Sequence, residues 1–379
     1  MSETLIIPLE GRIDSNNAGE FEENTRGVIA QNPGKDIVFD ASKLEYISSA
    51  GLRVLMKIRK ETGQEVTVKD VSMEVYEIFE VTGFTEILNV EKRIRELSVD
   101  GCEVIGRGFF GTVYRVNEDT IVKVYNTPEA PKMIKNEQGM ARAAFVAGIP
   151  TAISFDMVKV GENYGSVFEM LNAKTYNELV IESPEKSEEI IDSYVDFIKT
   201  VHETDIVDGK LPLAKDNFSK YLDFVKEYLK DGQYEKLAQF LETVPDENHM
   251  VHGDFHMKNV MLSEGEPMLI DMDTISKGHP YFDIAGIYVS YQLFKEDEPD
   301  NTENFMGIPA STADLIWNTI MNRYFDDKDE GEKKKILRDI RVLANVRFLY
   351  IVTSTELKEG ELGKKRIDHS ISHLEELLA

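Results

Sequence analysis

Cysteine and long apolar runs are scarce in this chain. Its 379 residues include one cysteine, Cys102, which excludes an intrachain disulfide framework and a zinc site built from several thiolates. No apolar run approaches the roughly 20 residues that a membrane-spanning helix needs. Residues 1–10 lack the basic start and the long apolar core of a secretory signal peptide. We therefore expect a cytoplasmic protein in a reducing environment, with no membrane partner.

Positive charge is also in short supply. The chain has 43 basic and 69 acidic side chains, a formal net charge of -26. Binding to nucleic acid or to an anionic membrane surface needs a positive field, so we expect neither. A cationic substrate would be attracted, although acidic balance alone does not identify one. The hydrophobic content of 42% is enough for sizeable cores, and the length suggests two or three domains.

The first quarter of the sequence, residues 1–98, alternates short apolar strands with helices. Strands are expected at 5–7, 37–39, 65–68 and near 87–88, and helices at 18–31, at 50–62 and around 71–79. Such alternation predicts a layered α/β domain of about a hundred residues. The charged segment Glu91–Glu96 predicts a short connecting helix or a linker.

Three segments of this quarter are similar to the STAS domain, the fold of bacterial anti-sigma-factor antagonists: Gly11–Asp14, Asp40–Leu44 and Tyr46–Leu52. In that family a Ser or Thr just before the second helix is the phosphorylation switch, and by position this implies Ser49. A phosphate there would add about -1.5 to -2 charges at a helix N-terminus, where free N–H groups favour an anion. Alternatively, Ser48 or Ser49 is simply the helix N-cap. The resemblance implies a regulatory domain that docks a partner protein.

A dense polar motif occupies residues 252–259, His-Gly-Asp-Phe-His-Met-Lys-Asn, and Asp271 follows a later apolar run. Phosphoryl transfer needs a carboxylate that orients the attacking hydroxyl and accepts its proton, and ligands that hold Mg²⁺ against the nucleotide phosphates. Asp254 suits the first role, while Asn259 and Asp271 suit the second. Two short strands with a turn between them would bring Asp271 back beside Asn259.

A glycine-rich segment, Gly106–Val113, has the spacing GxGxxGxV. The first part of this pattern also marks dinucleotide-binding folds, but there the last glycine leads into a helix. The residues after Gly111 are typical of a strand instead. A hairpin that covers nucleotide phosphates fits better. Its predicted nucleotide-contacting positions are Gly106, Gly108, Gly111 and Val113.

One lysine, Lys123, interrupts the next apolar strand at 121–125. Behind a glycine-rich hairpin, such a lysine is the candidate that neutralises the α- and β-phosphates. Its partner should be a glutamate on the following helix, expected at 132–145. We favour Glu137. Glu129 is the alternative, and it is less favoured because it lies beside a proline near the helix start.

The motif at 252–259 and the segment Ile270–Asp273 resemble the aminoglycoside phosphotransferase and choline kinase branch of the protein-kinase-like fold. A later segment, Gly278–Ala285, is similar to a further motif of that family. The glycine-rich segment is more similar to that of protein kinases than is typical of aminoglycoside kinases. The resemblance implies ATP and Mg²⁺ as cofactors. It also implies the fold class α/β plus α+β, in which a small layered STAS α/β domain precedes a two-lobed protein-kinase-like domain. The expected domains are 1–98, an N-lobe at 99–172 and a C-lobe at 173–379.

The resemblance also assigns roles by position. Asp254 becomes the catalytic base, and Asn259 and Asp271 become metal ligands. His252 and Asp283 become structural supports. Glu169 and Leu171 become hinge residues that hold adenine through backbone groups. Asp273 stands where eukaryotic protein kinases usually have glycine. A second metal contact, a substrate carboxylate and mere loop polarity all remain open for it.

The short interval between Asp271 and Asp283 leaves no room for the activation loop and peptide platform of protein kinases. This favours a small-molecule hydroxyl as the phosphate acceptor. The remaining sequence, including 317–325 and 336–357, has helical periodicity and should shape the substrate pocket. Two rivals stay open: a signalling kinase that phosphorylates a STAS serine such as Ser49, and a non-catalytic regulator that binds nucleotide.

Overall fold

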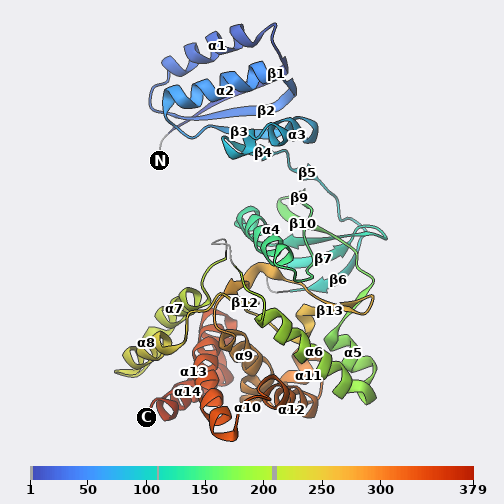
Figure 1. Ribbon diagram of the computed structural model, residues 1–379, viewed down its shortest axis with the longest axis vertical. Coiled ribbons are helices and arrows are strands. Elements are labelled where there is room, and N and C mark those ends of the chain that lie inside the picture. Colours follow the sequence, from blue (N-terminus) through green and yellow to red (C-terminus); the bar gives the residue numbers. More distant parts are fainter. Residues whose placement is uncertain (1–2, 109–110, 207–210) are drawn as a thin grey trace. The chain divides into compact units, whose positions relative to one another are not determined.

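The computed structural model divides the chain into two compact units (Figure 1). The first comprises Met1–Ser98 with Val158–Glu162, and the second comprises Val99–Met157 with Asn163–Ala379. The structure describes residues 3–108, 111–206 and 211–379. Phe109 and Phe110, in the middle of the glycine-rich segment, lie outside the described residues. Each unit has its own hydrophobic core.

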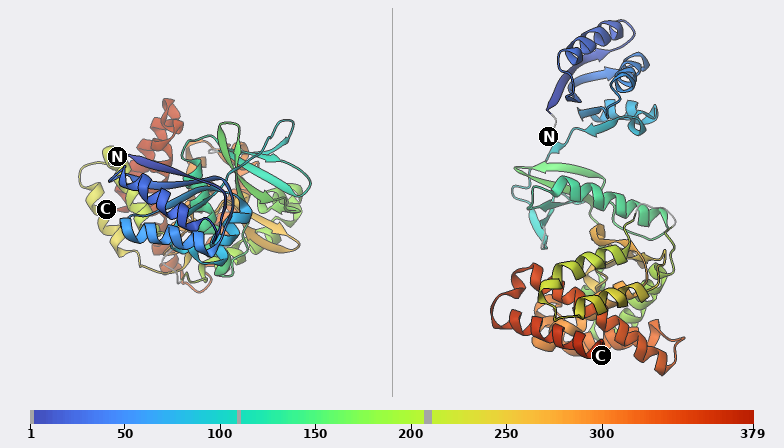
Figure 2. Two further views of the ribbon diagram at one scale, coloured as in Figure 1. Left: turned by 90° about the horizontal axis from the view of Figure 1, so that it is seen from above. Right: turned by 90° about the vertical axis from the view of Figure 1, so that its left-hand side faces the viewer.

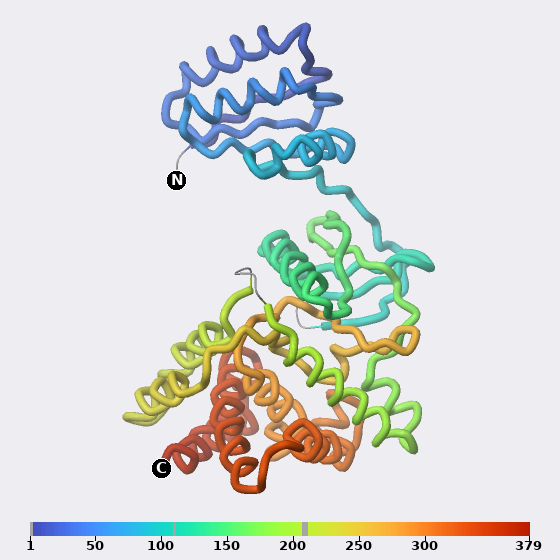
Figure 3. Tube along the Cα trace, in the orientation of Figure 1, coloured from blue at the N-terminus to red at the C-terminus, as the bar shows by residue number. Residues whose placement is uncertain are grey.

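The first unit is built on a parallel sheet. Its strands and helices are β1 (Thr4–Ile13), α1 (Ala18–Ala30), β2 (Asp36–Ile47), α2 (Ser49–Thr62), β3 (Thr67–Val71), α3 (Met73–Val81) and β4 (Asn89–Lys92). The four strands lie in the order β1-β2-β3-β4 and all pair in parallel. Helices α1 and α2 run side by side (Figures 1 and 3). Phe39, Leu55 and Phe79 are fully buried in the shared core.

The predicted α/β alternation of this unit is confirmed, and α1 and α2 match the predicted helices within one residue at each end. Gly63 ends α2 with a left-handed φ of 67°, a conformation that glycine adopts without strain. The option of a helix at Glu91–Glu96 is wrong. Backbone groups of this segment pair with neighbouring strands: β4 reaches Lys92, and Arg95–Glu96 form β5. Six residues are too few for a stable helix without tertiary support.

Two adjacent serines at the start of α2 have different environments. Ser48 is the N-cap, and its hydroxyl accepts the Ala50 N–H at 3.2 Å. Ser49 is the exposed first residue of the helix. We expect Ser48→Ala to destabilise α2 by about 1 kcal/mol because a helix N–H loses its acceptor. Ser49→Ala should change stability by under about 0.5 kcal/mol. Hydrogen exchange of the α2 amides in the full chain measures both, and equal effects would contradict the capping assignment.

An antiparallel sheet and one helix form the small lobe of the second unit. Its elements are β6 (Glu103–Arg107), β7 (Gly111–Arg115), β8 (Thr120–Tyr125), α4 (Ala130–Val146) and β10 (Asn163–Glu169). Most of strand β9 (Asp156–Val160) belongs to the first unit. Strands β6, β7, β8 and β10 are neighbours in that order. Tyr125, Ala130 and Ile134 form a small core under α4. The predicted hairpin at the glycine-rich segment is confirmed, since β7 rather than a helix follows the glycines.

Helices dominate the large lobe of the second unit (Figure 2). They are α5 (Tyr176–Glu182), α6 (Ser187–His202), α7 (Ala214–Val225), α8 (Gln233–Thr243), α9 (Tyr281–Tyr288), α10 (Phe294–Asp297), α11 (Asn301–Met306), α12 (Ala310–Thr319), α13 (Glu330–Ser354) and α14 (Gly360–Leu377). The short strands are β11 (Ala173–Thr175), β12 (Met250–Val251), β13 (Val260–Ser263), β14 (Glu266–Leu269) and β15 (Ser276–Lys277).

The long helix α13 organises this lobe. It packs against α7, α9 and α14, and α7 lies alongside it (Figure 3). The helical periodicity predicted at 317–325 and 336–357 corresponds largely to α12, a π-helical turn at Ile320–Tyr324, and α13. Among the described residues, no helix is long and apolar enough to cross a bilayer.

Candidate active site

A tight hairpin returns the chain to the polar motif. β13 and β14 pair antiparallel, with Val260 opposite Leu269. The N–H of Ile270 then donates to the carbonyl of Asn259 at 3.0 Å. Asp271 is therefore the first residue beyond a backbone contact with Asn259. The predicted return of the chain to this point is confirmed.

Asp254 lies between β12 and β13, and its two carboxylate oxygens face different partners. Oδ2 accepts a hydrogen bond from Asn259 Nδ2 at 3.2 Å and lies 3.4 Å from His256 Nε2. Oδ1 lies 3.4 Å from Nη2 of Arg347, on α13. Burial favours the protonated carboxyl, but the charges of His256 and Arg347 outweigh it and hold the pKa of Asp254 below its usual range. The group is thus a carboxylate at neutral pH, able to accept a hydrogen bond from a hydroxyl.

Lys123, on β8, connects the small lobe to Asp271. Its Nζ lies 2.5 Å from Asp271 Oδ1 and 3.7 Å from Oε1 of Glu137. Glu137 is buried on α4 and accepts a hydrogen bond from the Tyr125 hydroxyl. Burial works to lower the pKa of Lys123, but the carboxylates of Asp271 and Glu137 raise it overall, so the amine stays charged. The alternative, Glu129, stands at the N-cap of α4 instead.

Asp283, on α9, lies fully buried beneath the polar motif. Its Oδ2 accepts the His252 N–H at 2.7 Å, and its Oδ1 accepts the Gly253 N–H at 2.6 Å. Oδ2 also lies 3.0 Å from Nε2 of His202, on α6. The other ring nitrogen of His202 lies 2.8 Å from the Tyr324 hydroxyl. One carboxylate thus fixes two consecutive peptide groups just before Asp254.

The ring of His252 ties the start of the motif to the segment around Asp271. Its Nδ1 accepts the Asp254 N–H at 3.2 Å, which leaves Nε2–H to donate to the Ile270 carbonyl at 3.0 Å. The His252 carbonyl accepts the Thr274 hydroxyl at 2.8 Å. Residues on both sides of Asp271 are therefore bonded to His252.

Gly253 and Gly265 form a matched pair of glycines with left-handed φ values of +86° and +87°. A Cβ added at Gly253 would lie 2.6 Å from the Thr274 carbonyl oxygen. Among the described residues, nothing lies within 4 Å of a Cβ at Gly265. An alanine at either position would be strained by the left-handed backbone, but only at Gly253 would it also clash with Thr274.

We expect Gly265→Ala to destabilise the second unit by about 1 kcal/mol, and Gly253→Ala by roughly 3 kcal/mol or more. The chain's one tryptophan, Trp317, lies in this unit. Urea unfolding followed by its fluorescence measures both losses. Equal losses for the two variants would show that the loop accommodates the extra methyl group.

Gly111 sits closely against β8. A Cβ there would lie 2.2 Å from the Val124 carbonyl oxygen, so only glycine fits without a backbone shift. Gly106 pairs with Val113 across the hairpin, and the Gly108 N–H donates to the Gly111 carbonyl at 2.9 Å. The predicted nucleotide-contacting glycines therefore belong to one hairpin.

The predicted hinge lies at the other end of the small lobe's sheet. Glu169 is the exposed last residue of β10, and Leu171 is half-buried just beyond it. Between them, the N–H of Met170 donates to the carbonyl of Asp119 at 2.9 Å. The segment thus leaves the sheet here and leads toward β11.

Asp273 is half-buried two residues after Asp271. Burial first, and the neighbouring charge of Asp271 second, raise the pKa of Asp273 to about 7. The three roles considered for this residue stay predictions.

Several side chains that touch the motif were not anticipated from the sequence, among them Arg347, His202, Tyr194 and Tyr291. The Tyr194 hydroxyl donates to the Phe255 carbonyl, and the Tyr291 hydroxyl accepts the Met257 N–H. All four come from segments distant in the sequence; Arg347 follows Asp254 by 93 residues. The one available signal for Arg347 was a charge set between apolar residues of a predicted buried helix, Val346 and Phe348. Such a residue is rarely buried unless it has a partner.

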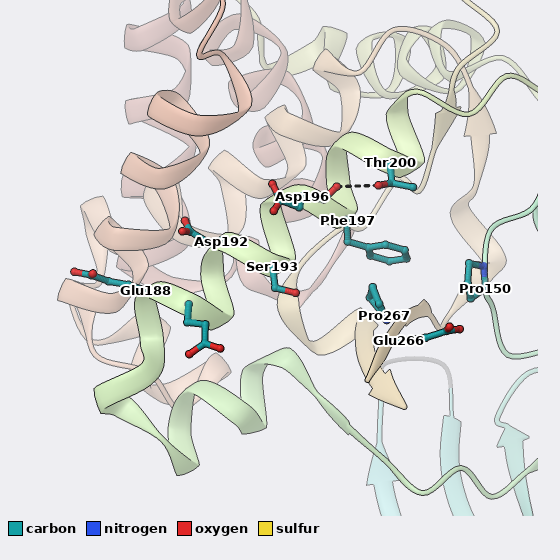
Figure 4. Close-up of a pocket in the computed structure, with 10 residues that line it drawn as sticks. Pro150, Glu188, Asp192, Ser193, Asp196, Phe197, Thr200, Glu266 and Pro267 are labelled. Atoms are coloured by element: carbon teal, nitrogen blue, oxygen red, sulfur yellow. Dashed lines mark hydrogen bonds between the residues drawn. The ribbon is translucent and has the colours of Figure 1, made fainter. Parts of the chain in front are cut away.

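A separate hollow of about 770 Å³ lies along α6 and the β13–β14 turn (Figure 4). Glu188, Asp192 and Asp196 line its helical side. Asp192 and Asp196 form ion pairs with Arg323. None of the predicted site residues lines this hollow, so it is distinct from the candidate active site.

Comparison with known proteins agrees with the two-unit division. Residues 2–97 match the STAS domain, and residues 101–303, more than half of the chain, match the phosphotransferase enzyme family known as APH. The chain belongs to the APH phosphotransferase family. A STAS domain precedes its APH region.

Individual relatives divide between the two units of this APH phosphotransferase. BtrV of Bordetella bronchiseptica, whose name describes an anti-sigma factor antagonist, is 35% identical over 89 residues, which are 23% of this chain and 76% of BtrV. A thermostable mutant of the aminoglycoside phosphotransferase APH(4)-Ia has a TM-score of 0.50 and 13% identity, covering 73% of this chain and 93% of that one. A choline/ethanolamine kinase family protein from Mesorhizobium loti has a TM-score of 0.46 and 14% identity, covering 73% and 87%. The comparison with APH(4)-Ia supports the two-lobed fold alone.

Proposed function

We propose that this phosphotransferase moves the γ-phosphoryl group of ATP to a hydroxyl of a small molecule, with Mg²⁺ as cofactor. The observation that carries the proposal is the set of polar contacts made by Asp254 and Asp271. Asp254 is bonded to Asn259, and Asp271 is paired with Lys123. These are the groups that phosphoryl transfer requires: a proton acceptor, metal ligands and a cation for the phosphates.

Asp254 is the proposed catalytic base. Its carboxylate orients the acceptor hydroxyl toward the phosphorus atom and takes up the proton as the new P–O bond forms. The low pKa of this group keeps it ionised before the reaction. His252 and Asp283 are the proposed supports, because both hold the backbone that leads into Asp254.

Asn259 and Asp271 are the proposed ligands for Mg²⁺. An amide oxygen and a carboxylate are hard donors of the kind that this ion prefers. In the described parts of the chain, no three His, Cys, Asp or Glu side chains form a metal cluster. Mg²⁺ usually takes one or two protein ligands together with water and nucleotide phosphates. When bound, the ion neutralises charge on the phosphates.

Lys123, held by Glu137, is the proposed cation for the α- and β-phosphates. Gly106, Gly108, Gly111 and Val113 would cover the phosphates, and the backbone at Glu169 and Leu171 would receive adenine. This division assigns 99–172 to the nucleotide-binding lobe and 173–379 to the acceptor-binding lobe.

The segment after Asp271 supports a small acceptor. A short turn, β15 and the start of α9 occupy the whole interval to Asp283. A protein kinase places its peptide-docking platform in this interval. The compact chain path leaves the acceptor to be bound by helices of the large lobe.

The STAS domain is proposed to regulate the kinase or to dock a protein partner. A second candidate function, phosphorylation of a STAS serine, is favoured by one observation: Ser49 is exposed at the start of α2. Incubation with ATP followed by mass spectrometry tests it. Wild-type protein without phosphate on Ser49, in cis or on an added second chain, removes this candidate.

An acceptor screen tests the main proposal. ADP release from ATP is measured with neutral, anionic and cationic hydroxyl compounds, each with Mg²⁺ and again with excess EDTA. We expect at least one acceptor to stimulate ADP release well above the rate with water, and EDTA to abolish the stimulation. The proposal fails if no acceptor stimulates ADP release.

A further inference from the structure

We propose that the acceptor carries an anionic group, a carboxylate or a phosphate, near the hydroxyl that receives the phosphoryl group, and that Arg347 binds this group. The inference rests on the proposed function, because it takes Asp254 as the group that receives the hydroxyl. It adds the chemical class of the acceptor and the residue that selects it.

Arg347 approaches Asp254 from the side opposite Asn259. Oδ2 of Asp254 faces Asn259, on the proposed metal side, whereas Oδ1 faces Arg347. An acceptor hydroxyl that does not compete with Asn259 must reach the carboxylate on its Oδ1 side. Whatever substituent the acceptor carries next to that hydroxyl then lies beside the guanidinium.

The guanidinium of Arg347 has few protein partners. The Arg347 side chain is only 15% exposed. Its five N–H groups have, within the described residues, one polar protein contact, the 3.4 Å approach to Asp254. That distance is too long for a strong hydrogen bond between charged groups, which is normally about 2.7–2.9 Å. Among the described residues, no guanidinium nitrogen of Arg347 is a fully buried polar atom without a partner. Its free N–H groups therefore face solvent, where a bidentate oxyanion would bind them.

Gly286 leaves space for the side chain of Arg347. A Cβ added at Gly286, on α9, would lie 2.9 Å from Nη1 and 3.1 Å from Cζ of Arg347. The guanidinium therefore lies directly against the backbone of α9. A side chain at position 286 would displace it from Asp254.

Aromatic side chains flank the same region. Tyr350, one turn after Arg347 on α13, stacks on Tyr221 of α7 with ring centroids 4.3 Å apart. Phe224 meets Tyr350 edge-on at 5.3 Å. Burial raises the pKa of Tyr221, and the charge of Arg347 opposes that rise. Tyr221 and Tyr350 are half-buried and Phe224 is 47% exposed, so these rings leave the region accessible to an entering acceptor.

The net charge of the chain does not override this local cation. Exposed charges more than about 10 Å away are largely screened at physiological ionic strength. A bound group in contact with Arg347 responds mainly to the charges beside it, which include Arg347 and the Asp254 carboxylate 3.4 Å away. A cationic substituent placed against the guanidinium would meet direct repulsion from it, although the overall charge of the chain is -26.

Matched acceptors separate charge from the reacting hydroxyl. Glycerol, D-glycerate and glycerol 3-phosphate offer hydroxyls beside a neutral, a carboxylate and a phosphate group, and choline offers one beside a cation. Affinities are measured by calorimetry in the presence of ADP and Mg²⁺, and phosphoryl transfer is measured with ATP. We expect at least one of the two anions to bind roughly tenfold or more tightly than glycerol. Whichever anion binds more tightly identifies the carboxylate or the phosphate as the preferred group.

Substitution then tests the residue. Arg347→Gln should weaken binding of the preferred anion by roughly 10–100-fold and change glycerol binding by less than about threefold. Arg347→Lys keeps the charge but not the bidentate fork, so its affinity for the preferred anion should lie between those of the wild type and Arg347→Gln. Because it retains the positive charge, it also serves as a control for a folding defect. Arg338→Gln, at an exposed position on the same helix, should leave all affinities unchanged.

The outcomes separate the two proposals. Anions that bind no more tightly than glycerol overturn the inference, and so does an equal loss for anion and glycerol in Arg347→Gln, since Arg347 would then only position Asp254. Either result leaves the kinase proposal standing if transfer to another acceptor is seen. Arg347-dependent anion binding without transfer to any acceptor would support the inference about the ligand and count against the kinase proposal.

Discussion

Asp254→Asn is expected to slow phosphoryl transfer by roughly 10²–10⁴-fold, the usual contribution of a general base. The amide cannot accept the proton of the attacking hydroxyl. In the wild type, Asn259 Nδ2 and Arg347 Nη2 both lie beside carboxylate oxygens of Asp254. An asparagine would place its own N–H₂ group beside one of these two donors. ATP affinity should stay within about threefold, because the proposed phosphate contacts belong to Lys123 and the glycine-rich hairpin.

Single-turnover kinetics with a responsive acceptor and a fluorescent nucleotide titration measure the two quantities separately. Asp231→Asn is the matched control, since Asp231 is exposed between two helices away from the motif, and it should keep full activity. Unchanged transfer in Asp254→Asn would exclude Asp254 as the base. A comparable loss of ATP affinity would assign it to nucleotide binding instead.

Asp283→Ala is expected to have the largest effect on stability. The fully buried carboxylate accepts the N–H groups of His252 and Gly253 and lies 3.0 Å from the ring of His202. Its loss leaves these groups without an acceptor, and removing one member of such a buried network costs roughly 3–5 kcal/mol. Transfer activity should fall with it, because the backbone that positions Asp254 loses both bonds.

Urea unfolding followed by Trp317 fluorescence measures this loss. Asp283→Asn keeps one oxygen acceptor but turns an amide N–H₂ toward a backbone N–H, so it should be intermediate. Asp231→Ala, an exposed control in the same unit, should change stability by less than about 0.5 kcal/mol. A loss below about 1 kcal/mol in Asp283→Ala would mean that water or a rearranged loop satisfies the freed donors.

Local patterns carried most of what could be predicted. The helices α1 and α2 have clear apolar periodicity, and Gly63 marks the end of the second. The return of Asp271 to Asn259 needs only a four-residue strand, a turn and a second strand, all adjacent in the sequence. The hairpin at Gly106–Val113 could be distinguished from a dinucleotide-binding turn because its last residues favour a strand.

Contacts between distant segments could not be predicted in this way. Arg347 approaches Asp254 only because α13 packs against α9, where Gly286 leaves space for the guanidinium. His202 reaches Asp283 from α6. Such contacts depend on helix packing, which periodicity does not specify. The option of a helix at Glu91–Glu96 was wrong for the same reason, since the strands that pair with this segment lie elsewhere in the chain.

The fate of the γ-phosphoryl group tests the central claim most directly. ATP, Mg²⁺ and the acceptor that best stimulates ADP release are incubated with the full chain and followed by ³¹P NMR, with mass spectrometry of the protein. The proposed function predicts a new phosphate monoester on the small molecule that EDTA and Asp254→Asn both abolish. Recovery of the phosphate only as inorganic phosphate, or only on Ser49, would contradict it.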